Sequence, residues 1–159
     1  MGPALAIKAA AGRRFALVTF GVSQVLIDVE PLVHMLRGDR VLHGFFHTFL
    51  GATLLVIPSA LVGLALVRLA IARRFLGTAA GRWLDDLGEA SVMAAVVGAV
   101  AGTWSHVFLD GLMHADLRPF APWSDATPWL HVVPVGAIHL FCLLAGIVGA
   151  VAVAGSHRA

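Results

Sequence analysis

The sequence is poor in charged residues. Asp, Glu, Lys and Arg make up 13% of its 159 residues, whereas about 25% is usual in a soluble globular domain. Hydrophobic residues make up 59%, and the mean hydropathy is +0.89. Few soluble cores bury so much apolar surface. We therefore expect a chain of this length to form one domain whose solvent is the lipid bilayer.

Cysteine and clustered basic residues are also scarce. Cys142 is the single cysteine and lies in an apolar run, which excludes an internal disulfide and a zinc site built from several cysteines. We expect it to be a small buried side chain. The Lys and Arg residues are scattered and are not interleaved with aromatic residues, so nucleic acid is not an expected partner.

Long apolar runs dominate what remains. A helix needs about 20 mostly apolar residues to cross a bilayer. The clearest run, residues 48–67, holds no charged residue, and the least clear, residues 15–36, carries Asp28, Glu30 and His34 in its second half. We predict an all-α fold, an integral membrane four-helix transmembrane bundle that forms a single domain over residues 1–159. The predicted spans are residues 15–36, 45–72, 88–112 and 129–154.

The basic residues of this four-span chain divide unequally between the two sides of the membrane. Three of them, Arg37, Arg40 and Arg118, fall on one side. The remaining eight fall on the other: Lys8, Arg13, Arg14, Arg68, Arg73, Arg74, Arg82 and Arg158. The positive-inside rule then predicts a multi-pass protein of the cell inner membrane with both termini in the cytoplasm. The loops at 37–44 and 115–128 would face outward.

Small residues within the third span predict a close helix contact. Gly98 and Gly102 are four residues apart, a spacing that lets the backbones of two membrane helices approach each other.

The ionisable residues inside the predicted spans lie toward the outer face. At 1.5 Å per residue, Asp28 lies about 21 Å along the first helix and His106 about 24 Å along the third. His43 and His47 lie at the head of the second helix, and His131 falls in the first turn of the fourth. All four helices are therefore expected to bring polar groups to one end of the bundle.

The spacing of these residues indicates that they act together. His43 and His47 are four residues apart, as are Glu30 and His34, and His114 lies eight residues after His106. Four-residue spacing places side chains on one face of a helix. Ionisable groups at membrane depth are costly and normally face the bundle interior. Imidazole with carboxylate suits zinc, manganese or iron. We predict a site for one or two divalent ions, zinc first, with the ligands Asp28, Glu30, His43, His47, His106 and Asp110.

Each of these residues also has a purely structural interpretation. The site residues can satisfy one another as a buried polar network without metal. His139, alone in the fourth span, is expected to make an interhelical hydrogen bond, and His131 to lie at the interface. Glu89, with Asp85 and Asp86, is expected to favour the start of the third helix through its dipole.

Three short stretches carry a family resemblance. They are Ile27-Asp28-Val29-Glu30-Pro31, His43-Gly44-Phe45-Phe46-His47-Thr48 and Ser105-His106-Val107-Phe108-Leu109-Asp110. In order and spacing they are similar to the acidic, paired-histidine and His-x-x-x-Asp motifs of membrane-bound metal-dependent hydrolases of the YdjM type and related domains of unknown function. Pro119-Phe120-Ala121-Pro122 is similar to the proline-aromatic outer loop of that family.

The resemblance covers about residues 20 to 125 and differs from the family pattern at two positions. Glu30 stands where the family commonly has a second Asp, and Pro31 follows that residue instead of preceding the motif. Gly44 follows His43, where an Arg is common. These differences leave the number of metals and the role of each ligand open.

The resemblance implies metal-assisted hydrolysis. A bound metal lowers the pKa of its water and polarises the electrophile. Asp28 and Glu30 are the candidate catalytic residues, each as a ligand, with Glu30 as a bridging ligand or the general base. His34 and His114 are expected to orient a ligand. Arg37, Arg40 and Arg118 either clamp an anionic substrate group or solvate the loops.

The position of the site at the outer interface points to a membrane lipid, a lipid-linked phosphoester or another small amphiphile as substrate. Three other functions stay open. A haem-binding electron carrier needs axial histidine pairs at matching depth. A metal or proton transporter needs polar groups along a whole path, but the inner halves of the spans are almost purely apolar. A non-catalytic membrane protein needs neither.

Overall fold

The computed structural model describes residues 2–72 and 88–156, and within these ranges its secondary structure is entirely helical. Four segments are long and apolar enough to cross a membrane, namely Leu17–Arg37, Phe49–Ala70, Val92–Met113 and Val135–Gly155. The predicted all-α four-helix membrane fold is thereby confirmed. Some residues named above lie outside the described ranges: Arg73, Arg74, Arg82, Asp85, Asp86 and Arg158.

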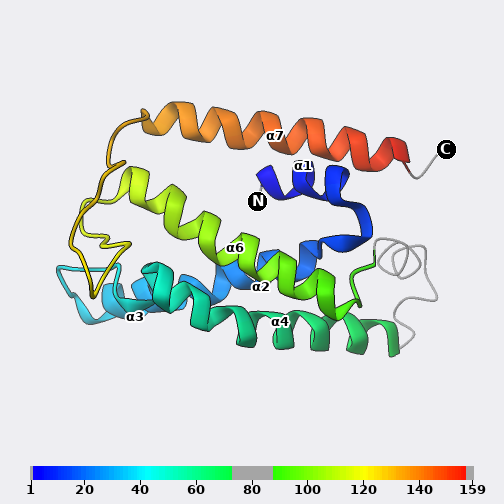
Figure 1. Ribbon diagram of the computed structural model, residues 1–159, viewed down its shortest axis with the longest axis horizontal. Helices are drawn as coiled ribbons and strands as arrows, with labels where there is room; N and C mark the ends of the chain where they lie inside the picture. The colour runs from blue at the N-terminus through cyan, green and yellow to red at the C-terminus, as the bar shows by residue number, and fades with distance from the viewer. Residues whose placement is uncertain (1, 73–87, 157–159) are drawn as a thin grey trace.

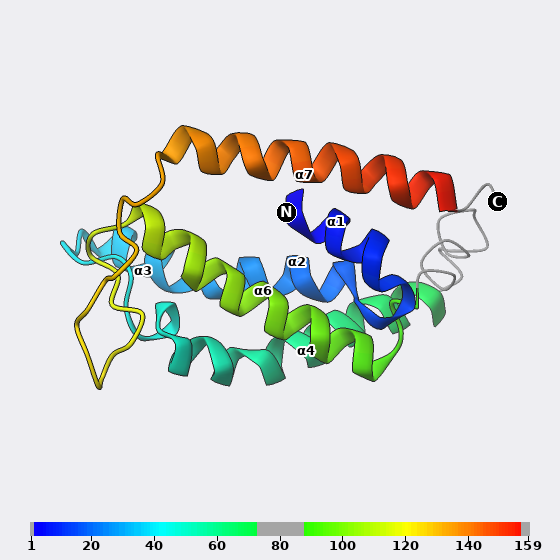
Figure 2. The ribbon, with the colours of Figure 1, turned by 45° about the horizontal axis from the view of Figure 1, so that its top comes forward.

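Three helices form the main bundle. The helices α2 (Leu17–Ile27), α4 (Phe49–Ala72) and α6 (Val92–Met113) pack against one another along the long axis of the molecule (Figure 1). The fourth span, α7 (Val135–Ser156), lies to one side and packs mainly against α1 (Gly2–Ala11), which separates it from the others (Figure 2). A cluster of small and branched side chains fills the contact between α4 and α6: Ala60, Leu64, Ala95 and Ala99.

The helix α1 is absent from the predicted spans because its 10 residues are too few to cross a bilayer. It packs closely on α7, where a Cβ on Gly149 would overlap the backbone of Ala6. Gly2 lies beside Cys142, within the first half of α7. From there α1 runs to the short 3-10 helix η1 (Gly12–Arg14), at the end of the bundle opposite to α3 (Figure 1).

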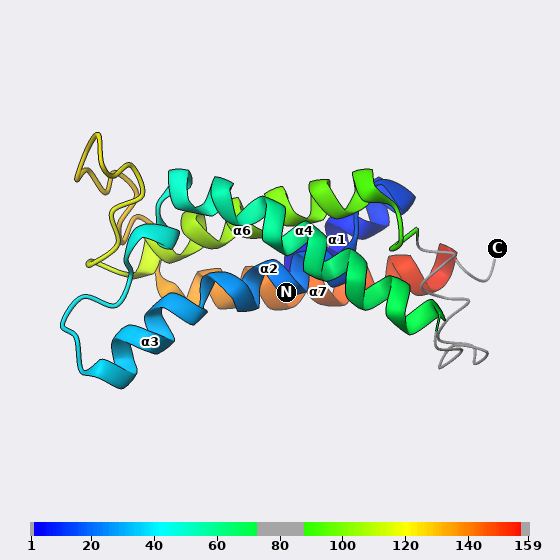
Figure 3. The same ribbon diagram turned by 90° about the horizontal axis from the view of Figure 1, so that it is seen from below.

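The first predicted span is two helices instead of one. The helix α2 ends at Ile27 and α3 (Val29–Arg37) follows at an angle, with Asp28 at the junction (Figure 3). Pro31 explains the break, because it has no N–H to offer the carbonyl of Ile27 and its ring displaces that carbonyl. The kink places Asp28 at the bend.

The predicted helical pairing of His43 with His47 is wrong. Residues 41–44 have no regular structure, and His47 ends a short 3-10 helix, η2 (Phe45–His47). The helix α4 starts only at Phe49, because Thr48 is extended and its Oγ1 accepts the Gly51 N–H at 2.9 Å. Thr48 is thus an N-cap, and the two histidines precede the helix.

The prediction that His106, Asp110 and His114 share a helix face is correct only for the first two. The helix α6 ends at Met113, and His114 is extended, with φ −109° and ψ 117°. The helix α7 likewise begins later than predicted, at Val135, because Pro134 has the fixed φ that favours the start of a helix. His131 consequently lies in the loop between α6 and α7, with φ 58°.

The two glycines of α6 permit the close approach that the sequence predicts. A Cβ on Gly98 would overlap the carbonyl oxygen of Ala16, and one on Gly102 would overlap Oγ of Ser23. The helices α2 and α6 therefore touch at backbone distance. This contact sets the separation between Asp28 on one helix and His106 on the other.

Glu89 has a different role from the predicted one. It is fully buried, and its Oε1 accepts hydrogen bonds from Lys8 Nζ at 2.9 Å and from Leu17 N–H at 3.0 Å. Its Oε2 accepts the Val18 N–H at 2.9 Å. Glu89 thus caps the start of α2 instead of the start of its own helix, and it pairs with the one lysine of the chain.

Candidate metal centre

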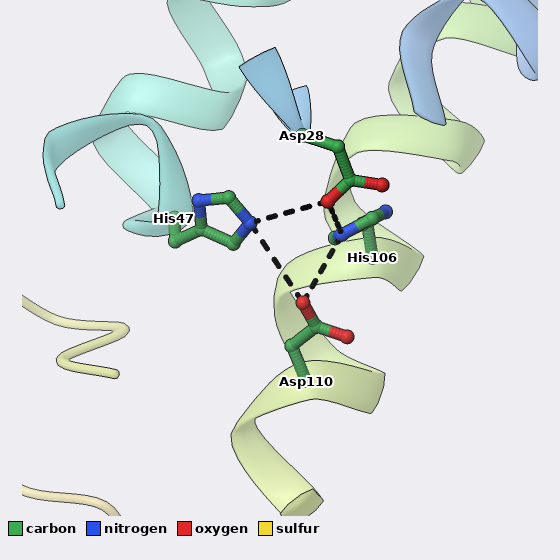
Figure 4. A group of neighbouring side chains, drawn as sticks. All are labelled: Asp28, His47, His106 and Asp110. Atoms are coloured by element: carbon green, nitrogen blue, oxygen red, sulfur yellow. Dashed lines mark ion pairs between the residues drawn. The ribbon is translucent and has the colours of Figure 1, made fainter. Parts of the chain in front are cut away.

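Four side chains converge at the end of the bundle where α3 and η2 lie. One ligand atom each from Asp28, His47, His106 and Asp110 lies within 4.8 Å of those of the other three. Asp28 comes from the α2–α3 junction and His47 from η2, while His106 and Asp110 are one turn apart on α6 (Figure 4). All four belong to the predicted ligand set.

The two imidazoles direct Nε2 toward the carboxylates. His106 Nε2 lies 3.1 Å from Asp28 Oδ1 and 3.1 Å from Asp110 Oδ2. His47 Nε2 lies 3.9 Å and 3.7 Å from the same two atoms. Both Nε2 atoms are buried and make no hydrogen bond. A nitrogen lone pair that faces carboxylate oxygens at these distances is unfavourable unless a proton or a cation lies between them, and a cation between the four side chains would remove that repulsion.

The opposite nitrogen of His106 is anchored by Gln24. Gln24 Nε2 donates to the carbonyl of Gly102 at 2.8 Å, so its amide oxygen faces His106 Nδ1 at 3.0 Å. An amide oxygen only accepts, so His106 Nδ1 carries the proton. In the neutral ring the lone pair of His106 is then on Nε2, which is the form that binds a metal.

His47 is anchored in the same way by Glu30. His47 Nδ1 lies 3.2 Å from Glu30 Oε2, which also accepts the Phe46 N–H at 2.9 Å. Gly44 makes room for this carboxylate, since a Cβ there would lie 2.7 Å from Glu30 Oε1. Glu30 therefore lies behind His47 and outside the group of four, although its place in the sequence predicts it as a ligand.

His43 is arranged like His47 and His106, with an acceptor at Nδ1 and with Nε2 near Asp110. His43 Nδ1 lies 3.0 Å from Asp116 Oδ1, and His43 Nε2 lies 4.0 Å from Asp110 Oδ2. The Nε2 atoms of all three histidines are thus within 4.0 Å of one oxygen of Asp110. Each has an acceptor at Nδ1.

Asp116 fixes the turn that carries His43. Its Oδ2 accepts the N–H groups of Leu42 at 2.9 Å and of His43 at 3.2 Å. Burial raises the pKa of Asp116, but the hydrogen bonds from these two N–H groups and from the His43 ring outweigh that effect and lower the pKa to about 2. The side chain is therefore a carboxylate at neutral pH.

Gln24 and Asp116 are members of the site that the sequence pattern did not predict. Gln24 lies four residues before Asp28, and Asp116 lies two residues after His114. The spacing of four residues between Gln24 and Asp28 could have indicated that Gln24 belongs to the site. A search for ionisable residues misses it, because Gln24 is neutral. For Asp116 only its proximity to His114 in the sequence is a signal.

A cavity of about 420 Å³ opens at the centre. Its polar wall consists of Asp28, His43, His106, Asp110 and His114. Its apolar wall comes chiefly from α3, through Pro31, Leu32 and Met35. The cavity is therefore amphipathic, with ligand side chains opposite hydrocarbon.

Besides Glu30 and His47, four predicted site residues do not line this cavity. His34 Nδ1 pairs with Asp39 Oδ2 at 2.7 Å, and the Arg118 guanidinium donates to the carbonyls of Ala115 and Leu117. The exposed residues Arg37 and Arg40 do not line it. The helix α7 adds none of the clustered ligands. His131 in the preceding loop is not among them either, and its backbone N–H donates to the carbonyl of Leu112.

Apolar side chains pack next to the centre. Ile27, Ala52, Val107 and Leu117 form a fully buried cluster, and three of them adjoin Asp28, His106 and Asp116 in the sequence. Phe49 contacts Trp104, Phe120 and Trp129, which ties the outer loop to α4 and α6. Rigid surroundings of this kind hold ligands in place.

Comparison of the chain with protein-family models, with curated proteins and with solved structures found no match in any of the three.

Proposed function

We propose that this protein is a membrane-embedded, metal-dependent hydrolase with its site at the outer membrane interface. The observation that carries the proposal is the pair of buried Nε2 atoms on His47 and His106, which make no hydrogen bond and face two carboxylates. The resemblance of the three motifs to membrane-bound metal-dependent hydrolases supports the same reaction class.

The donor set fits a divalent transition metal. Nitrogen from imidazole together with carboxylate oxygen suits zinc, with manganese or iron as alternatives. Metal-binding histidines usually donate their second N–H to a carboxylate, a carbonyl or water. Glu30 and Gln24 are such acceptors for His47 and His106.

A divalent ion held by these residues would polarise an ester or phosphoester and lower the pKa of water. Of the two predicted catalytic carboxylates, Asp28 suits proton transfer better. Its side chain is 56% exposed and lines the cavity. Glu30 is 12% exposed and already bonded to His47 and to a backbone N–H. We therefore assign proton acceptance to Asp28 and orientation of His47 to Glu30.

The walls of the cavity support an amphiphilic substrate. Leu32 and Met35 line it and are also 52% and 61% exposed on the surface of a membrane-spanning segment. On the other face of α3 lies an apolar cavity of about 330 Å³, bordered by Val33, Leu55 and Glu30. A lipid or lipid-linked phosphoester would place its polar bond at the ligands and its hydrocarbon along α3.

The first test is the metal content of the detergent-purified protein, measured by elemental mass spectrometry. We expect stoichiometric zinc, manganese or iron in the wild type and a loss of at least half of it in His106→Ala. The matched control is His131→Ala, which removes a histidine of the outer loop and should leave the content unchanged. Wild-type metal content in His106→Ala would contradict the proposed centre.

The second test concerns hydrolysis. The metal-loaded protein is assayed with bis(4-nitrophenyl) phosphate in detergent and with phosphatidic acid and phosphatidylglycerol in vesicles. The assay contains enough added zinc to keep the centre loaded, because Asp28→Asn also removes a charged ligand; we expect turnover to disappear in this variant even with metal bound, since Asn keeps the shape but not the basicity. Turnover equal to that of the wild type in Asp28→Asn would contradict the assigned role.

A further inference from the structure

A second group of ligand side chains adjoins the first. One ligand atom each from His43, His114 and Asp116 lies within 4.8 Å of the others. We propose that this group binds a second divalent cation, so that the centre is binuclear. The inference rests on the proposed function, because it extends the same metal centre.

The two groups meet at Asp110. His43 Nε2 lies 4.0 Å from Asp110 Oδ2, the same oxygen that faces His47 and His106. The ring centroid of His43 is 4.8 Å from that of His47 and 4.4 Å from that of His114. His43 therefore stands between the groups, and Asp110 is placed to contact an ion in either one.

The second group retains lone pairs for an ion. Within the described part of the chain, neither ring nitrogen of His114 makes a hydrogen bond, and its ring contacts that of His43. Asp116 Oδ2 accepts two backbone N–H groups, whereas Oδ1 faces only His43 Nδ1. A carboxylate oxygen has two lone pairs, so Asp116 Oδ1 has one left.

The charge of the region matches two divalent cations. Asp28, Glu30, Asp110 and Asp116 bring four carboxylates to this end of the bundle, and their ion pairs within the described ranges are with histidines alone. Carboxylates that are partly buried are stabilised by a nearby cation. A single divalent ion compensates half of this charge, and two compensate all of it.

The simpler alternative is that Asp116 only holds the turn at Leu42 and His43. In that case His43 is directed at a single ion, and His114 is an unneeded neighbour. The two arrangements differ in metal stoichiometry, which makes them separable by one measurement.

The experiment is equilibrium dialysis of the full-length, metal-stripped protein in detergent against Mn²⁺, with bound metal determined by elemental mass spectrometry. We expect two equivalents in the wild type and one in both His114→Ala and Asp116→Asn. The control His131→Ala should keep two. Size-exclusion profiles and helical circular dichroism verify that each variant is folded, and Asp116→Asn keeps an acceptor oxygen for the turn.

Electron paramagnetic resonance of the Mn²⁺-loaded samples gives an independent readout. Neighbouring ions in the wild type should give an exchange-coupled spectrum, and His114→Ala should give the six-line spectrum of an isolated ion. One equivalent in both the wild type and His114→Ala overturns the inference, as does a count of two in all variants. Absence of any bound ion overturns the proposed function as well. Two ions without hydrolysis contradict only the hydrolase assignment.

Discussion

At the scale of single residues, the centre depends on side chains that do not touch the proposed ion. Each of its three imidazoles has an acceptor at Nδ1, an amide from Gln24 in one case and a carboxylate in the other two. These acceptors determine which nitrogen is free, and they limit the rotation of the ring. The neutral amide is the weakest of them, so it is the best place to test orientation apart from charge.

We predict that Gln24→Leu lowers metal affinity. Leucine has a similar size but cannot accept the Nδ1–H of His106, so the ring loses its orientation and its tautomer. Loss of such an outer partner typically costs 10–100-fold in affinity. Competition for Zn²⁺ with a chelating dye measures it. Gln24→Glu keeps an acceptor and should lose less, and equal affinity in Gln24→Leu and the wild type would refute the role.

At the scale of elements, helix contacts and helix ends position the ligands. The Pro31 kink turns α3 away and leaves Asp28 at the bend, and the Thr48 cap delays α4 so that His47 stays in the preceding turn. The glycine contact between α2 and α6 brings Asp28 to His106. The centre is therefore a property of three element boundaries and one close helix crossing.

We predict that Gly98→Ala destabilises the protein and also weakens metal binding. The added Cβ would overlap the backbone of Ala16, which cannot rotate away, so α2 must move off α6. Overpacking of this kind costs about 1–3 kcal/mol. Thermal unfolding in detergent and the zinc competition measure the two effects.

The control for this change is Gly155→Ala near the end of α7, where a Cβ meets nothing within 4 Å. Its melting temperature and zinc affinity should equal those of the wild type. If Gly98→Ala behaved like this control, the close helix contact would not be what positions the site.

The opposite end of the bundle is fixed by the buried pair of Lys8 and Glu89. Glu89 joins three segments, because it bonds Lys8 of α1 and the first N–H groups of α2 from a position just before α6. Removal of one member of a buried ion pair is far more costly than a surface change. This pair anchors α1, and through α1 it holds α7 to the rest of the molecule.

At the scale of the whole molecule, the polar centre and the outer loops lie at one end, with η1 and the end of α7 at the other (Figure 1). The charge distribution predicts that the end with the centre faces outward, in the periplasm of a bacterium. This orientation decides which pool of substrates the cavity meets.

We predict that a green fluorescent protein fused to the C-terminus fluoresces and that an alkaline phosphatase fused there is inactive, because the distribution of basic residues predicts a cytoplasmic terminus. A complementary variant carries Ser124→Cys in a Cys142→Ser background and should react with a membrane-impermeant maleimide in intact cells. An active phosphatase at the C-terminus would invert the orientation and place the centre inside.

The membrane class, the four spans and the end of the bundle where the polar residues lie all follow from the order of residues alone. Hydropathy and helical rise accumulate along the chain, so they are readable without knowing any contact. The sequence pattern also identified His106 and Asp110 as site residues, because both lie in one helix and are one turn apart.

Which atoms meet depends instead on the packing of the folded chain. His43 and His47 both approach Asp110, although neither of them lies in an α-helix. Gln24 binds His106 and Asp116 binds His43, and in each pair the two residues are far apart in the sequence. The short helix α1 and the partnership of Glu89 with α2 were likewise invisible in the sequence pattern. Caps, kinks and backbone contacts between segments fix these positions, and a linear pattern does not contain them because such interactions are not local in sequence.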